Sequence, residues 1–167
     1  MPLTFEQPHK AKLIDVNPRS EVHGKDLKPA LDLRFEMDAS HAVLDQLHRN
    51  LAGLLFERDE TQLPGVDSWA LRLPKLKQPL HWDDEAVGND LSVDMGVNGE
   101  ERIELHDCRV HKHVIHAKEG GTVTLSWTAS CTHDLTRETV GLLGTRVQHD
   151  VAVALRATQP VLTSVDI

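Results

Sequence analysis

The sequence contains no tyrosine, and aromatic residues make up only 4 % of its 167 residues. Proteins that bind single-stranded nucleic acid use aromatic side chains as stacking platforms between cations. Basic residues are also in the minority, with 18 Lys and Arg against 26 Asp and Glu and a formal net charge of −8. Coating nucleic acid by phosphate neutralisation needs the opposite balance. The composition therefore ranks nucleic-acid binding behind other functions.

Cysteine is scarce, and long apolar runs are missing. The two cysteines, Cys108 and Cys131, are too few for the disulfide scaffold of a small secreted domain. No segment approaches the roughly 20 apolar residues of a membrane span, and the first ten residues lack the apolar core of a signal peptide. We expect a cytoplasmic protein with both cysteines as thiols.

The size and composition predict a single domain. Residues 1–167 fall within the usual range of one domain, about 100–200 residues. An apolar fraction of 40 % with 26 % charged residues is ordinary for a globular protein with a sizeable core.

Alternation of apolar and polar side chains predicts most of the strands. In residues 30–38 every second residue is apolar, which is typical of a strand with one buried face. Residues 10–16 predict an earlier strand, ended by turn residues at 17–20 and followed by a polar link over 21–28. Further strands are expected at 69–73, 80–82, 91–95, 102–117, 122–131 and 147–155, with an Asn98-Gly99 hairpin turn before the strand at 102.

Two helices are expected between these strands. Ser40 is a suitable N-cap for a helix with one apolar stripe formed by Val43, Leu44, Leu47, Leu51, Leu54 and Leu55. Asp134 or Thr136 could cap a short second helix that ends at Gly144. No regular βαβ alternation results, so the sequence predicts a mainly β (α+β) fold, an antiparallel β-sandwich with two short helices.

Histidines and cysteines cluster in the second half. If residues 118–121 form a four-residue loop, Cys108 lies opposite Cys131 and His106 lies opposite His133. Two cysteines and two histidines are a ligand set for tetrahedral zinc. The alternative is a pair of structural thiols, because Val110, Leu125 and Trp127 share that face, which predicts a core face, and buried cysteines behave as small hydrophobes. The apolar residues before and after His106-Asp107 do not follow a single alternation. This predicts a bulge there that would move His106 off the face that carries the cysteines.

Two other histidines of this strand, His111 and His113, fall on the opposite face, facing Thr124, Ser126, Thr128 and Ser130. That pattern predicts a solvated surface. The alternative is a pH-sensitive patch or adventitious metal binding, since histidine titrates near neutral pH and ligates metals.

Catalytic motifs are missing. The sequence has no phosphate-binding loop, nucleophile elbow or zincin helix. Residues 83–85, Asp-Asp-Glu, could hold a hard cation beside His81, but a solvated turn is the simpler interpretation. The sequence thus favours a non-enzymatic protein without cofactor, with zinc at the cysteine cluster as the alternative.

Two segments carry a resemblance to a known family. Residues 11–24 (Ala-Lys-Leu-Ile-Asp-Val-Asn-Pro-Arg-Ser-Glu-Val-His-Gly) and 119–125 (Glu-Gly-Gly-Thr-Val-Thr-Leu), leading to Cys131-x-His133, resemble small proteins of tailed phages and prophages. The order of strands and helices is also similar over most of the chain. The resemblance implies an early or accessory phage protein in the host bacterial cytoplasm, and it supplies no catalytic residues.

These observations give one leading hypothesis and two alternatives. The leading one is a non-enzymatic phage accessory protein that binds a host or phage protein and inhibits an antiviral defence complex. Its acidic charge has the sign expected for binding a basic nucleic-acid-handling partner. The alternatives are an accessory factor that binds single-stranded DNA in phage recombination or replication, and a metal-dependent enzyme. Free strand edges also leave open a homodimer.

Overall fold

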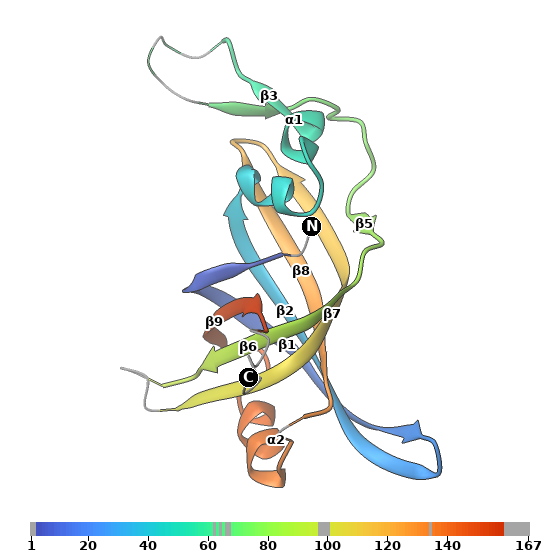
Figure 1. Ribbon diagram of the computed structural model, residues 1–167. Helices are drawn as coiled ribbons and strands as arrows, with labels where there is room; N and C mark the ends of the chain where they lie inside the picture. The colour runs from blue at the N-terminus through green and yellow to red at the C-terminus, as the bar shows by residue number, and fades with distance from the viewer. Residues whose placement is uncertain are drawn as a thin grey trace, which may run out of the picture.

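Six strands form one antiparallel sheet that closes on itself (Figure 1). The computed structural model describes residues 3–61, 63, 65, 68–96, 101–133 and 135–158. The six strands are β1 (Phe5–His23), β2 (Asp26–Ser40), β6 (Ala86–Asp94), β7 (Arg102–Lys118), β8 (Thr122–Cys131) and β9 (Asp150–Ala157). They follow the order β7-β6-β9-β1-β2-β8, and β8 pairs again with β7. The prediction of a mainly β fold is confirmed.

The predicted sandwich is wrong, because the sheet is a closed barrel rather than two stacked layers. Alternation within a strand shows which face is buried, but it does not show whether the sheet closes. Closure is achieved at β8, which pairs with β2 along one edge and with β7 along the other. Each strand of the barrel thus buries one face in a shared interior. Its largest fully buried side chains include Leu13, Leu33, Phe35, Leu125 and Trp127.

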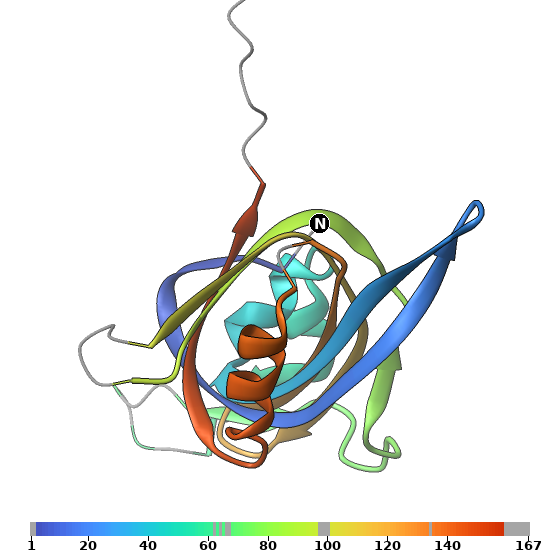
Figure 2. The same ribbon diagram turned by 90° about the horizontal axis from the view of Figure 1, so that it is seen from below.

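Short helices lie at the two ends of the barrel (Figures 1 and 2). At one end are the 3-10 helix η1 (His41–Gln46) and α1 (Leu51–Leu55), and at the other is α2 (Arg137–Gly144). Three further strands are short: β3 (Phe56–Arg58) pairs with β4 (Trp69–Leu71), and β5 (Leu80–Trp82) pairs with β7. No described helix has the length and apolar character needed to cross a membrane.

The first predicted helix is divided into two pieces. Ser40 caps η1 as expected, accepting a hydrogen bond from the Ala42 N–H. Asn50 then adopts a left-handed conformation with φ 66°, which interrupts the helix before α1. The apolar stripe is otherwise preserved, except that Leu54 is exposed. At the other end, α2 is capped by Thr136 and ends at Gly144, as predicted; Asp134 lies outside the described residues.

Two bulges set the register of β7. The pairing Lys118↔Thr122 next to the loop differs by one residue from the predicted register. A bulge between His111 and Val114, with Lys112 at φ 54°, then shifts the pairing by one residue. The two differences cancel, so that Arg109 pairs with Ser130 and the two cysteines lie side by side as predicted. The bulge predicted near residue 107 is also present, with Asp107 at φ 54°.

β1 does not end at the turn predicted for residues 17–20 but continues to His23. Its neighbours explain the difference. β9 pairs with β1 only as far as Lys12, and β8 pairs with β2 only from Leu31. Beyond these points β1 and β2 form a two-stranded hairpin with free edges, where prolines are tolerated.

We call residues 17–29 of this hairpin the arm. It includes Pro18 and Pro29 and projects beyond the barrel wall (Figures 1 and 2). A tight turn links His23 to its partner Asp26. Gly24, with φ 65°, supplies the conformation that this turn requires. The turn predicted at Asn98-Gly99 lies outside the described residues.

Candidate functional site

The two thiols form a close pair inside the barrel. Cys108 and Cys131 are free, fully buried, and have their sulfur atoms 2.7 Å apart. The hydrogen bond with Cys108, together with burial, raises the pKa of the Cys131 thiol. A high pKa suppresses the thiolate, which is the reactive and metal-binding form. The geometry thus supports the structural interpretation of these cysteines.

The two histidines of the predicted zinc set lie elsewhere. His106 is half-exposed because the bulge at residue 107 turns it away, and its Nδ1 lies 3.3 Å from Asp90 Oδ1. His133 is exposed and follows the last residue of β8 by two positions. The structure therefore brings together the two cysteines and not the two histidines. Among the described residues, no three His, Cys, Asp or Glu side chains are grouped as metal ligands would be.

The prediction that His111 and His113 share a solvated face is wrong for His113, which is 3 % exposed. The bulge at Lys112 reverses the alternation, so that His113 has the parity of the buried Ile115. Burial lowers the pKa of His113, and the nearby Asp84 offsets this only in part. His111 stays on the outer face and is half-buried.

A chain of hydrogen bonds crosses the outer face of β8. The Ser130 hydroxyl donates to Asp32 Oδ1 at 2.6 Å, and the His111 Nε2 lies 2.7 Å from the Ser130 oxygen. Arg19 Nε donates to the other carboxylate oxygen of Asp32 at 2.8 Å. Because the only serine hydrogen points to Asp32, His111 must donate to the serine oxygen. A catalytic serine instead donates to its histidine, so this order does not activate Ser130.

Two ionisable groups in this chain of hydrogen bonds, Asp32 and His111, have lowered pKa values. Burial alone would raise the pKa of Asp32, but the hydrogen bonds from Arg19 and Ser130 outweigh it and hold the pKa below its usual value. Burial, with the charges of Arg109 and Lys112, lowers the pKa of His111. At neutral pH, Asp32 in this chain of hydrogen bonds is therefore a carboxylate and His111 is a neutral imidazole.

Replacing Asp32 with asparagine is expected to destabilise the protein in a pH-dependent way. A carboxylate whose pKa is lowered by folding contributes stability above its unfolded pKa, about 3.9, and loses it as the pH falls through the folded value. The gap between the urea midpoints of wild type and Asp32→Asn should therefore be widest near pH 7 and narrow below pH 4. Ser130→Ala, which removes one of the donors, should give a smaller gap. A gap of constant width down to pH 3 would contradict the assignment.

A groove runs along the outer face of β8. Its floor includes the small side chains of Ser126 and Thr128, only 5 % and 8 % exposed. Its walls are the outward residues of β2 on one side and those of β7 and β5 on the other. Two cavities of about 380 Å³ each lie along it, and Arg34 and Val114 line both. The predicted solvated face is therefore a recess rather than an open surface.

The acidic segment 83–85 follows β5 beside this groove. Asp83 lines the first cavity and Glu85 lies 3.6 Å from Arg109. Asp84 accepts the Glu85 N–H. The three carboxylates thus have separate surroundings.

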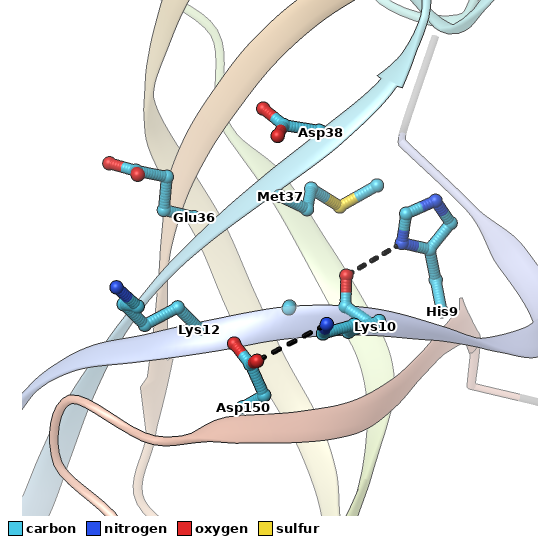
Figure 3. Close-up of a pocket in the computed structure, with 8 residues that line it drawn as sticks. His9, Lys10, Lys12, Glu36, Met37, Asp38 and Asp150 are labelled. Atoms are coloured by element: carbon cyan, nitrogen blue, oxygen red, sulfur yellow. Dashed lines mark hydrogen bonds and ion pairs between the residues drawn. The ribbon is translucent and has the colours of Figure 1, made fainter.

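A separate cleft opens where β1 and β2 diverge, beyond the pair Lys12↔Glu36 (Figure 3). Its volume is about 320 Å³. Charges of both signs line it, and Lys10 Nζ lies 3.3 Å from Asp150. Asp38, on the opposite wall, accepts from Thr124 and Lys118. Asp38 and Asp150, on the walls of the cleft, are therefore both held by partners.

The arm was not predicted as a functional element. Val22 and Leu27 are cross-strand partners near its tip, and each is 72 % exposed. The signal in the sequence was their symmetric placement about His23-Gly24-Lys25-Asp26, which is the pattern of a two-residue hairpin.

Comparisons with protein-family models, curated proteins and solved structures found no match to this chain.

Proposed function

We propose that the protein is a non-enzymatic phage accessory protein that binds a host or phage protein through its arm, and thereby inhibits an antiviral defence complex of the host. The observation that carries the binding proposal is the pair Val22 and Leu27, apolar neighbours near the tip of a projecting hairpin. The resemblance of residues 11–24 and 119–133 to phage proteins supplies the biological setting.

The tip of the arm has the chemistry of an interface anchor. Interfaces are typically centred on a few apolar side chains that fill a pocket of the partner, surrounded by polar groups. Around Val22 and Leu27 the arm presents three cations, Arg19, Lys25 and Lys28, and two carboxylates, Glu21 and Asp26. The partner we infer is a protein with an apolar pocket and a polar rim of both charge signs.

The arm is ordered before it binds. Arg19 ties it to the barrel through Asp32, and Arg19 also pairs with Glu21. His23 lies 3.1 Å from Glu21, and a proline stiffens each strand at the base. A binding element that is already rigid loses less conformational entropy on association, which favours affinity.

A pull-down from a lysate of the bacterial host tests the proposal. The double variant Val22→Lys with Leu27→Lys should lose the captured partner, because two charges cannot enter an apolar pocket without a large desolvation cost. Val87→Lys is the matched control, since Val87 is 75 % exposed but lies on β6. The control should capture the same partner, identified by mass, as wild type.

Capture that survives the double variant would overturn the role of the arm. Light scattering of the purified protein tests the alternative that the arm mediates a homodimer. A mass of two chains that returns to one chain in the double variant would mean that a second copy covers the tip, which would contradict a foreign partner at this site.

A further inference from the structure

We propose that the groove on β8 binds the backbone of a single-stranded oligonucleotide, with one phosphate held by Arg34. The inference does not rest on the arm, which lies outside the barrel wall. It rests on two cavities and on two cations that form no ion pair with any described residue, which meet on the outer face of three neighbouring strands.

Arg34 occupies the centre of the groove. It is the cross-strand neighbour of Thr128 and lines both cavities. Five of the ten arginines form an ion pair with a carboxylate, namely Arg19, Arg72, Arg102, Arg109 and Arg146, whereas Arg49, Arg58, Arg137 and Arg156 form none among the described residues. Arg34 forms no ion pair or hydrogen bond within the described part of the chain. Its guanidinium is therefore available for an anion, and its planar donors match a phosphate.

Lys112 faces Arg34 across the groove. The bulge places it at φ 54° and leaves its ammonium exposed, again without a carboxylate partner among the described residues. Bulges often re-aim a side chain beside a functional site. Between the two cations lies Thr128, and its hydroxyl forms no hydrogen bond to any described group. Two cations and a free hydroxyl make a set of donors for one phosphate.

The two cavities on either side of Arg34 suggest a ligand with a repeating unit. Each volume of about 380 Å³ lies in the usual range of small-ligand sites, about 300–1,000 Å³. Trp82 lines the first cavity, and Pro79 with Val114 lines the second. A base in each cavity and the linking phosphate at Arg34 is the arrangement of a dinucleotide step.

The groove is less acidic than the protein as a whole, which favours it as the site for an anionic ligand. Its charged lining consists of Arg34, Lys112 and Lys118 against Glu36 and Asp83, and Lys118 pairs with Asp38 at its edge, so this region is close to neutral on a chain of −8. The two carboxylates keep the attraction small. We therefore expect weak binding that depends on salt and not on sequence, with a dissociation constant of about 10⁻⁴–10⁻⁶ M.

Fluorescence anisotropy with a labelled ten-residue oligo-deoxythymidine tests the inference, using the full-length protein at low salt. Arg34→Gln and Lys112→Gln should each weaken binding about tenfold and flatten the slope of log affinity against log salt, which is about 0.7 in magnitude for one neutralised phosphate of a single strand. Arg137→Gln, at the start of α2, is the matched control and should bind as wild type. Thr128→Val keeps the shape of the floor and should weaken binding without changing the salt slope.

Three results would overturn the inference. The first is the absence of binding at 100 µM protein, about a hundred times the lower limit of the expected dissociation constant. The second is an equal loss of affinity in Arg34→Gln and Arg137→Gln. The third is displacement of the oligonucleotide by thymidine monophosphate or inorganic phosphate at the same concentration as the oligonucleotide. The last would show a site for a single phosphate without the dinucleotide step. Circular dichroism of each variant verifies the fold; if Arg34→Gln is unfolded, Lys112→Gln and Thr128→Val decide.

Discussion

Replacing Trp127 with alanine is expected to lower the free energy of unfolding by about 3–5 kcal/mol, the usual cost of the cavity left by a buried tryptophan. Trp127 is fully buried, and its ring centroid lies 4.8 Å from that of Phe35 and 6.0 Å from that of Phe5. For a chain of this size the melting temperature should fall by about 6–20 °C. Calorimetry and urea denaturation measure both quantities.

The conservative variant separates packing from hydrogen bonding. The Trp127 Nε1 has no hydrogen-bond partner among the described residues. Trp127→Phe therefore loses volume and no hydrogen bond, and it should cost clearly less than alanine. A Trp127→Ala protein that keeps its melting temperature but loses its partner would show that Trp127 is a binding residue and not part of the core.

Native Cys108 and Cys131 are expected to react with iodoacetamide about a thousandfold or more slowly than the same thiols in denaturant. Both side chains are fully buried, so alkylation requires opening of the barrel, which costs a large part of a total stability near 5–15 kcal/mol. The hydrogen bond between the sulfurs and the raised pKa of Cys131 slow the reaction further. Mass spectrometry after timed quenching gives both rates.

The double substitution Cys108→Ser with Cys131→Ser tests the role of the pair. It should reduce stability modestly and leave partner capture unchanged. About one zinc ion per chain in elemental analysis, with unfolding by a chelator, would instead support the metal hypothesis. Loss of capture in a folded double variant would contradict the structural role.

Local patterns in the sequence predicted the positions of most of the strands. The alternation at residues 30–38 and the continuous strand at 122–131 depend only on neighbouring residues, and both are present as predicted. Closure of the barrel was not predictable in this way, because it depends on which strands meet β8 from distant parts of the chain. The division of the first helix at Asn50 likewise depends on one left-handed residue that helical spacing does not reveal.

The candidate site was predictable only in part, for the same physical reason. The contact of Cys108 with Cys131 followed from the hairpin, although the register near the loop was one residue off. The bulge at Lys112 was not foreseen, and it decides that His113 is buried and that Lys112 faces the groove. Nor did alternation distinguish an open polar face from a recess, since the walls around Ser126 come from β2, from β7 and from Pro79, which precedes β5.

The most direct test of the arm as the docking element is photo-crosslinking in the bacterial host. A benzophenone-bearing amino acid would replace Val22 in one variant and Val87 in another, two positions with exposed fractions of 72 % and 75 %. The account predicts a covalent adduct of one defined host or phage protein from position 22 and none from position 87. The same adduct from both positions, or none from position 22, would contradict it.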